Sequence, residues 1–195
     1  MIVNNRYEFG VLLKSLNLNG NGLEIGVNDG GYSVYILTFG LKKVYLLDAW
    51  KEFPKTDYID IANVEQIIQD KRYQHVLKIM QPYGDKVEVI RGDSREEFKR
   101  FIDGFFDFIY IDANHEYKYI KQDLINWYPK VKVGGVIAGH DYRNGGHGGR
   151  GGTLFGVKAA VHEFCRENSL QHVVVPRSKR CPKSWYIVKT ERSKT

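Results

Sequence analysis

Residues 22–31 read GLEIGVNDGG, and this stretch decides the fold. It begins with a short apolar run at 22–25, and glycines follow at positions 26 and 30. Short runs that are nearly continuously apolar are typical of strands buried on both faces of a parallel sheet. Glycines directly after such a strand permit a tight turn, and the helix that follows offers its N-terminus to a carboxylate or phosphate group. The stretch therefore predicts a strand, a ligand-binding turn and a helix.

The same pattern recurs along the chain. Four further apolar runs of strand length cover residues 43–47, 86–90, 105–111 and 134–138. Between residues 120 and 131, and again between 157 and 165, apolar side chains recur every three or four positions, which is typical of a helix with one buried face. Ser94 and Glu97 predict a capping box that opens a further helix reaching Ile102.

The last part of the chain departs from this alternation. Residues 172–175 and 185–189 are two more strand-like runs, and no helix fits in the short polar loop between them. They therefore predict an antiparallel hairpin. Together with the five strand–helix repeats before them, they predict a doubly wound, three-layer α/β domain that ends in a hairpin.

Length and composition are those of one ordinary globular domain. The chain has 195 residues, of which 43% are hydrophobic and 27% charged. We expect a single domain over 1–195, with an N-terminal helical lead-in at 1–19, a glycine-rich loop at 144–156 and a basic tail at 190–195. No apolar run approaches the ~18 residues of a membrane span, the start does not resemble a signal peptide, and two cysteines do not form a disulfide framework. We therefore expect a cytoplasmic protein.

The net charge of +6 is unevenly distributed. Residues 177–195 contain seven basic residues and one acid, so they account for the whole surplus, and residues 1–176 are neutral. The basic side chains are not interleaved with aromatic residues along a groove, as they are in many nucleic-acid-binding proteins. The pattern disfavours nucleic acid as a partner and predicts a small-molecule acceptor, with no membrane contact. Whether the chain forms a homodimer stays open.

Acidic residues follow the first two predicted strands. Ligands of open parallel sheets bind at the carboxyl ends of the strands, and Asp48, eighteen residues after Gly30, could accept hydrogen bonds from both hydroxyls of a ribose. The dinucleotide fingerprint G-x-G-x-x-G requires a middle glycine, where this chain has Asn28, and Glu24 precedes the turn. These residues predict a nucleoside cofactor and disfavour NAD.

The later strand ends carry a more specific pattern. Residues 107–117 read DFIYIDANHEY and residues 133–142 read VGGVIAGHDY. With residues 24–30, they resemble class I S-adenosylmethionine-dependent methyltransferases, in particular a small subgroup that includes sugar O-methyltransferases of antibiotic biosynthesis. The resemblance covers about residues 20–168. It implies a Rossmann-like, seven-stranded, mostly parallel sheet with a C-terminal antiparallel hairpin, S-adenosyl-L-methionine as cofactor, and O-methylation of a small hydroxylated acceptor such as a sugar.

The resemblance also implies which residues bind the cofactor. The turn at 26–30 backs the methionine part, Asp48 holds the ribose, and Asp93 and Ser94 lie near the adenine. Trp50 either stacks on the adenine or fills the core. The expected cofactor-binding residues are Glu24, Gly26, Val27, Asn28, Gly30, Asp48, Ala49, Trp50, Asp93, Ser94 and Asp112.

Three residues are candidates for catalysis. Methyl transfer from an activated sulfonium requires an aligned acceptor oxygen and removal of its proton. His115 and His140 follow neighbouring strands and are the candidate bases, with Asp112 beside them. Some relatives bind a divalent cation at these strand ends, and Asp112 and Asp141 are the corresponding acids for Mg²⁺ or another divalent cation. His140 interrupts the usual pair of adjacent ligands, so Asp112 could instead contact only cofactor or substrate.

Two alternatives stay open. One is a nucleic-acid (RNA) methyltransferase, although residues 112–115 read DANH and lack the prolines common in enzymes that methylate exocyclic amines of bases. The other is a non-catalytic nucleoside-binding protein of the same fold. The glycine-rich loop at 144–156 is either a lid over the acceptor or an insertion.

Overall fold

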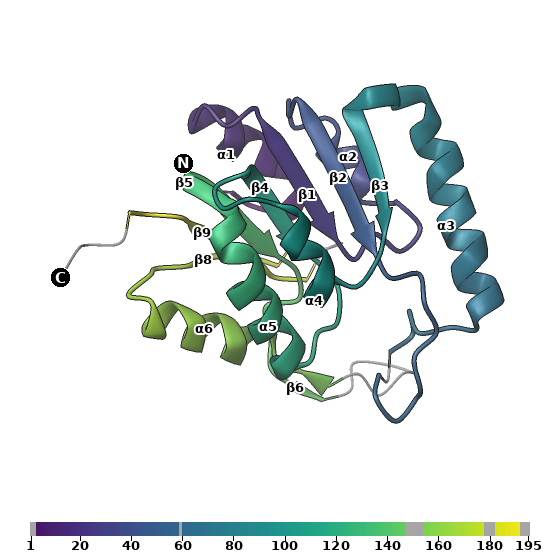
Figure 1. Cartoon of the computed structure of the whole chain (residues 1–195). Coiled ribbons are helices and arrows are strands. Elements are labelled where there is room, and N and C mark those ends of the chain that lie inside the picture. The colour runs from purple at the N-terminus through teal and green to yellow at the C-terminus, as the bar shows by residue number, and fades with distance from the viewer. Residues whose placement is uncertain (1–2, 59, 147–153, 178–181, 192–195) are drawn as a thin grey trace.

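The computed structural model describes residues 3–58, 60–146, 154–177 and 182–191 and contains a seven-stranded sheet (Figure 1). The strands, in sheet order, are β3 (Val87–Arg91), β2 (Lys43–Asp48), β1 (Asn21–Ile25), β4 (Phe106–Ile111), β5 (Val131–Gly139), β9 (Ser184–Val188) and β8 (Val173–Val175). Strands β1 to β5 pair in parallel, and β9 lies antiparallel between β5 and β8. The predicted seven-stranded, mostly parallel sheet with a C-terminal antiparallel hairpin is confirmed.

Helices cover both faces of the sheet and complete the three predicted layers. In Figure 1, α4 (Ser94–Glu97), α5 (Tyr117–Trp127) and α6 (Val157–Glu167) lie in front of the sheet. The other face carries α1 (Phe9–Ser15), α2 (Ser33–Ile36) and α3 (Gln66–Met80). Short 3₁₀ helices are η1 (Arg6–Glu8), η2 (Gln81–Lys86), η3 (Phe98–Arg100) and η4 (Tyr128–Lys130).

Strand β4 shows why its sequence is continuously apolar. All six of its residues are buried, and successive side chains point to opposite faces. Ile109 and Ile111 pack with the helices α5 and α6, whereas Phe108 and Tyr110 pack with α1 and α2. Each face of the central sheet therefore has its own apolar core, and the strand must be apolar on both sides.

The start of α4 differs from the prediction. The N-cap is Asp93, whose side chain accepts a 2.9 Å hydrogen bond from the amide of Arg95, and Ser94 is already helical. The predicted position of the cap is therefore wrong by one residue. The side chain of Asp93 accepts the capping hydrogen bond, so the hydroxyl of Ser94 is not needed for it. The helical segment ends at Arg100, and Ile102 lies beyond it, largely exposed.

The structure describes only parts of the predicted N-terminal lead-in, glycine-rich loop and basic tail. The N-terminal lead-in contains η1 and α1. In the glycine-rich loop, β6 (Gly145–Gly146) and β7 (Leu154–Phe155) pair in an antiparallel manner at the edge towards which the parallel strands point (Figure 1). Residues 147–153 of this loop, and 192–195 of the tail, lie outside the described residues. Among the helices that are described, none combines the length and the apolar character that crossing a bilayer requires.

Candidate active site

A cavity of about 660 Å³ opens at the carboxyl ends of β1 to β4. Nine of the eleven predicted cofactor-binding residues line it, together with His115: Glu24, Gly26, Val27, Asn28, Asp48, Ala49, Asp93, Ser94 and Asp112. Gly30, Trp50, His140 and Asp141 do not line it. The cavity also contains residues that the sequence analysis did not select, among them Arg6, Asp60, Tyr119 and Asp123.

The turn after β1 depends on a glycine at position 26. Gly26 has a φ of +90°, and a Cβ atom there would lie 2.2 Å from the carbonyl oxygen of Asp112. The Gly26 amide donates to the carbonyl of Leu47, and the Asp112 amide donates to the carbonyl of Ile25. These contacts hold the ends of β1, β2 and β4 together, so the turn and Asp112 form one rigid wall of the cavity.

Asp48 and Trp50 shape the loop on the neighbouring side. The Asp48 carboxylate accepts 2.8 Å hydrogen bonds from the backbone amides of Asn28 and Trp50, and burial raises its pKa. The Trp50 indole donates to the carbonyl of Asn28 and packs against Tyr73 in the core. The Trp50 side chain therefore supports the loop from the side of the core. The sequence left open whether Trp50 stacks on the adenine or fills the core, and in the structure it fills the core.

Glu24 lies deep in the cavity wall. Its carboxyl group is buried and accepts a hydrogen bond from the hydroxyl of Ser33, and burial raises its pKa to about 8. A carboxyl group with this pKa is mostly uncharged at neutral pH. Glu24 therefore adds little negative charge to this end of the cavity.

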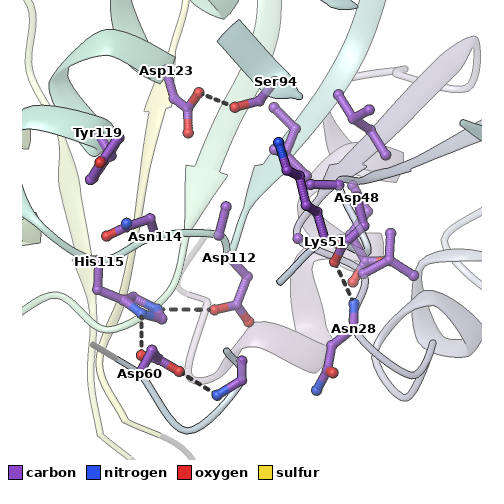
Figure 2. A pocket seen from close by; sticks show the side chains of 18 of the residues that line it. Asn28, Asp48, Lys51, Asp60, Ser94, Asp112, Asn114, His115, Tyr119 and Asp123 are labelled. Atoms are coloured by element: carbon purple, nitrogen blue, oxygen red, sulfur yellow. Dashed lines mark hydrogen bonds and ion pairs between the residues drawn. The ribbon is translucent and has the colours of Figure 1, made fainter. Parts of the chain in front are cut away.

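The opposite end of the cavity is built from α4 and α5. The Asp93 carboxylate accepts the capping hydrogen bond from the Arg95 amide and two more from the Arg95 side chain. The Ser94 hydroxyl donates a 2.7 Å hydrogen bond to Asp123 (Figure 2). Burial raises the pKa of Asp123 to about 7. Asp123 lies on the buried face of α5 with Ile120 and Leu124, and an acid on an apolar helix face is the signal by which the sequence could have revealed it.

His115 lies at the centre of a cluster of acids. Its Nε2 atom is 3.3 Å from Oδ1 of Asp112 and 3.4 Å from Oδ2 of Asp141, and its Nδ1 atom is 3.9 Å from Oδ2 of Asp60. Figure 2 shows the imidazole between Asp112 and Asp60. Asp60 comes from the long segment after β2, which crosses from the end of β2 to the end of β4 to reach this position.

The charges in this cluster shift the pKa values of its members. Burial by itself lowers the pKa of His115, but its contacts with the carboxylates of Asp112, Asp60 and Asp141 raise it to about 10. Burial likewise opposes ionisation of Asp112, yet the hydrogen bond from His115 and the charges of His140 and Arg6 hold the pKa of Asp112 below its ordinary value. The imidazole is therefore a cation in the ligand-free structure, balanced by the surrounding carboxylates.

His140 is placed differently from His115. It is buried, its Nδ1 atom is 3.2 Å from the hydroxyl of Ser184, and burial lowers its pKa. It lies behind the acids and does not face the cavity. The structure thus brings only one of the two candidate bases into the cavity wall.

Three ligand atoms of the cluster are close enough to share one cation. Asp112, His115 and Asp141 each offer one such atom within 4.8 Å of the others. Oδ1 of Asp141 is buried without a hydrogen-bond partner, although Nε of Arg143 lies 3.2 Å away. The two carboxylates offer the hard oxygen ligands that Mg²⁺, Mn²⁺ and related divalent ions prefer, so Asp112 and Asp141 fit the predicted cation.

Unsatisfied polar atoms gather at the same place. Among the described residues, five buried side-chain atoms lack a hydrogen-bond partner, and four of them surround Asp112: Arg6 Nε, Tyr110 Oη, His115 Nδ1 and Asp141 Oδ1. Buried polar groups in native proteins are almost always paired, so such a cluster indicates a place where a ligand binds.

The paired strands β6 and β7 border the cluster on its outer side. The ring of Phe155 lies 5.1 Å from the imidazole of His115, and the guanidinium of Arg143 stacks 3.5 Å above the same phenyl ring. The Gly156 amide donates to the carbonyl of His115. An apolar and a cationic side chain therefore stand next to the cluster.

Comparison with known proteins defines the class. The sequence profile of a family described as "Methyltransferase domain" matches residues 23–142, which include the turn after β1, Asp112 after β4 and Asp141 after β5. The chain belongs to this family and is an S-adenosylmethionine-dependent methyltransferase. A search of curated protein sequences returned no significant match.

Solved structures confirm the fold at low sequence identity. A Clostridium thermocellum protein proposed to be an rRNA methylase has a TM-score of 0.66 and 16% identity, over 99% of both chains. A Staphylococcus aureus protein proposed to be a caffeoyl-CoA O-methyltransferase has a TM-score of 0.62 and 15% identity, over 93% of this chain and 80% of that one. The 1,6-didemethyltoxoflavin-N1-methyltransferase of Burkholderia thailandensis, solved with S-adenosylhomocysteine, has a TM-score of 0.61 and 16% identity, over 95% and 78%. At these identities the similarity establishes the fold and leaves the acceptor undetermined.

Proposed function

We propose that this methyltransferase transfers the methyl group of S-adenosylmethionine to a hydroxyl group of a small acceptor such as a sugar, with His115 as the base. The observation that carries the proposal is the position of His115, which lies in the cavity wall between the carboxylates of Asp112 and Asp141. A base is useful here because the proton of the acceptor must leave as the oxygen attacks the methyl carbon. The carboxylates orient the imidazole and stabilise the imidazolium that results.

The cluster suits a hydroxyl acceptor better than an amine. An alcohol is a weak nucleophile at neutral pH, whereas a neutral amine can attack a sulfonium without prior loss of a proton. A base surrounded by three carboxylates is therefore of most use for oxygen. The positive charges of the sulfonium and of a bound cation both favour the neutral, proton-accepting form of His115.

We further propose that Asp112 and Asp141 bind a divalent cation. When bound, such a cation lowers the pKa of an acceptor hydroxyl. The two acids come from the ends of neighbouring strands, β4 and β5, and their backbones are fixed by the sheet. The φ of Asp141, +48°, lies in the left-handed region, which aspartate adopts more readily than most residues and which is found more often at functional sites.

The charge of the site disfavours RNA as the acceptor. The side chains nearest the proposed reaction centre include the acids Asp60, Asp112 and Asp141, whereas proteins that bind a polyanion present Lys and Arg side chains to its phosphates. Arg6, which lies in the cavity, is already paired with Asp112. RNA methylation is therefore the alternative function that the experiment below must exclude.

A methyl-transfer screen tests the proposed function. The full chain is incubated with radiolabelled S-adenosylmethionine, Mg²⁺ or Mn²⁺, and separate pools of sugars, nucleotide sugars, phenols, amines and RNA. We expect label in a hydroxylated small molecule, and mass spectrometry of the product should place the methyl group on oxygen. Label only in RNA or only on nitrogen would refute the proposal. Binding of S-adenosylhomocysteine without turnover of any pool would favour the non-catalytic alternative.

A further inference from the structure

Arg6 is a fixed cation in the wall of the cavity. Its Nη1 atom lies 3.0 Å from Oδ2 of Asp112, and its guanidinium carbon lies 4.4 Å from the centre of the Tyr32 ring. The Tyr32 hydroxyl donates a 2.7 Å hydrogen bond to the carbonyl of Arg6, so both the side chain and the backbone of Arg6 are held. The side chain is only 18% exposed. Little conformational entropy would therefore be lost when it binds a ligand.

One donor of this guanidinium is unused. The Nε atom of Arg6 is buried and has no hydrogen-bond partner. Arginine presents its donors in a planar fork that matches the two oxygens of a carboxylate or phosphate. An unpaired donor in the wall of an open cavity therefore indicates an anionic or strongly polar group of a ligand at this place.

The order of the strands indicates which part of the cofactor lies there. On the proposed function, the methyl group lies beside His115 and Asp112, at the end of β4. Asp48 and Ser94 follow β2 and β3, on the far side of β1, and neighbouring strands are about 4.8 Å apart. If the adenosine extends towards β2 and β3, the methionine part is left at the end of the cavity that Arg6 borders with Tyr32.

The surroundings of Arg6 also permit a carboxylate. Glu24, the buried acid of this end, is mostly uncharged near neutral pH because burial raises its pKa to about 8. Asp112 is neutralised by its contacts with Arg6 and His115. A second carboxylate would therefore meet the free donor of Arg6 without strong repulsion.

We propose that Arg6 binds the α-carboxylate of the methionine part of S-adenosylmethionine. The inference rests on the proposed function, which places the methyl group beside His115, and it does not depend on which hydroxyl compound is the acceptor. A carboxylate on the acceptor would have the same chemistry, so the test must separate the two sources.

The test compares two ligands that differ only in the carboxylate. The affinities of S-adenosylhomocysteine and its decarboxylated analogue are measured by isothermal titration calorimetry for the wild type, Arg6→Gln and Arg6→Lys. A hydrogen-bonded ion pair corresponds to a change of about 10- to 100-fold in affinity. We expect Arg6→Gln to weaken the affinity for S-adenosylhomocysteine by this factor and to change the affinity for the decarboxylated analogue by less than about 3-fold. The affinity of Arg6→Lys for S-adenosylhomocysteine should lie between those of the wild type and Arg6→Gln.

The matched control is Arg100→Gln, which removes a surface arginine that pairs with Glu88 and Glu97 outside the cavity. It should leave both affinities unchanged, and thermal melting of each variant verifies that it is folded. If Arg6→Gln lowered the affinity for both ligands equally, the proposal would be overturned, and Arg6 would be only a structural partner of Asp112. Unchanged binding of S-adenosylhomocysteine, with a raised KM for a carboxylated acceptor, would overturn it and assign Arg6 to the acceptor. If the wild type bound neither ligand, the assigned class of enzyme would itself fail.

Discussion

Arg6 and Asp112 are 106 positions apart in the chain, yet Nη1 of Arg6 lies 3.0 Å from Oδ2 of Asp112. The contact joins the N-terminal η1 helix to the end of β4, and it gives Asp112 a cationic partner on each side, since His115 lies 3.3 Å from its other oxygen. The residue at the centre of the proposed reaction site is thus held by groups from two distant parts of the chain. Asp112 is therefore fixed before any ligand binds.

The first prediction concerns the turn after β1. Gly26 and Gly40 both have positive φ values, +90° and +85°, but a Cβ atom at Gly40 would have nothing within 4 Å. Gly40→Ala should therefore lower the free energy of unfolding by only about 1–2 kcal/mol, the cost of placing alanine in the left-handed conformation. Gly26→Ala should lose more, and should also abolish binding of S-adenosylhomocysteine, because its Cβ atom would lie 2.2 Å from the carbonyl oxygen of Asp112.

Urea unfolding and calorimetry measure both quantities. The pair is informative because backbone strain is common to the two variants and the steric clash is not. If both variants lost equal stability and Gly26→Ala bound S-adenosylhomocysteine normally, the rigid wall formed by the turn and Asp112 would not exist.

A second prediction concerns pH and stability at Asp123. The ordinary pKa of its carboxyl group is 3.8, and burial raises it to about 7 in the folded protein. As pH rises from 4 to 7, the unfolded chain releases this proton first, so Asp123 makes the folded state progressively less stable, and the loss is complete above pH 7. The side chain of the Asp123→Asn variant cannot ionise, so this variant does not lose stability in this way as pH rises. Its free energy of unfolding relative to the wild type should therefore rise between pH 4 and pH 8, by on the order of 2–4 kcal/mol.

Denaturant titrations at several pH values provide the test. Asp103→Asn is the matched control, because Asp103 is exposed and its pKa is lowered by a hydrogen bond from Lys130. This control should show no comparable rise. A flat difference between Asp123→Asn and the wild type over the whole range would mean that Asp123 is ionised in the folded protein.

A third prediction concerns the cation. Titration of chelator-treated protein with Mn²⁺, followed by electron paramagnetic resonance, should detect one binding site, and Asp141→Asn or Asp112→Asn should weaken it by more than about 10-fold. The exposed variant Asp103→Asn should bind Mn²⁺ like the wild type. Methyl transfer should stop in excess chelator and return with Mg²⁺ or Mn²⁺. Turnover that persists in chelator, or equal Mn²⁺ affinity in all variants, would exclude the cation.

Much of the site could be predicted from the sequence because parallel strands bring their carboxyl ends to one edge. Asp48, Ser94 and Asp112 line the cavity because each comes after an apolar run that forms a strand, and Glu24 lines it from within the first such run. Trp50 could not be assigned in this way, because whether a loop aromatic faces a ligand or the core depends on its partner, which here is Tyr73 on α3.

The residues that the sequence did not reveal come from segments without a strand to position them. Arg6 lies before the first strand and Asp60 in the long segment after β2, and neither position has a local pattern that indicates its distant contact. The shift of the α4 cap from Ser94 to Asp93 has a similar origin. The Ser94 hydroxyl is engaged by Asp123, 29 residues further along the chain.

The rate of methyl transfer by the His115→Gln variant tests whether His115 is the base. Removal of a general base lowers kcat by about 10²- to 10⁴-fold. We predict a loss of this size with the accepted hydroxyl compound. The affinity for S-adenosylhomocysteine should stay within about 3-fold of the wild type, because the substitution leaves the expected cofactor-binding residues Gly26 and Asp48 in place. His75→Gln, on the exposed surface of α3, should retain wild-type kcat. A His115→Gln enzyme that binds S-adenosylhomocysteine and turns over at the wild-type rate would contradict the assignment of His115 as the base.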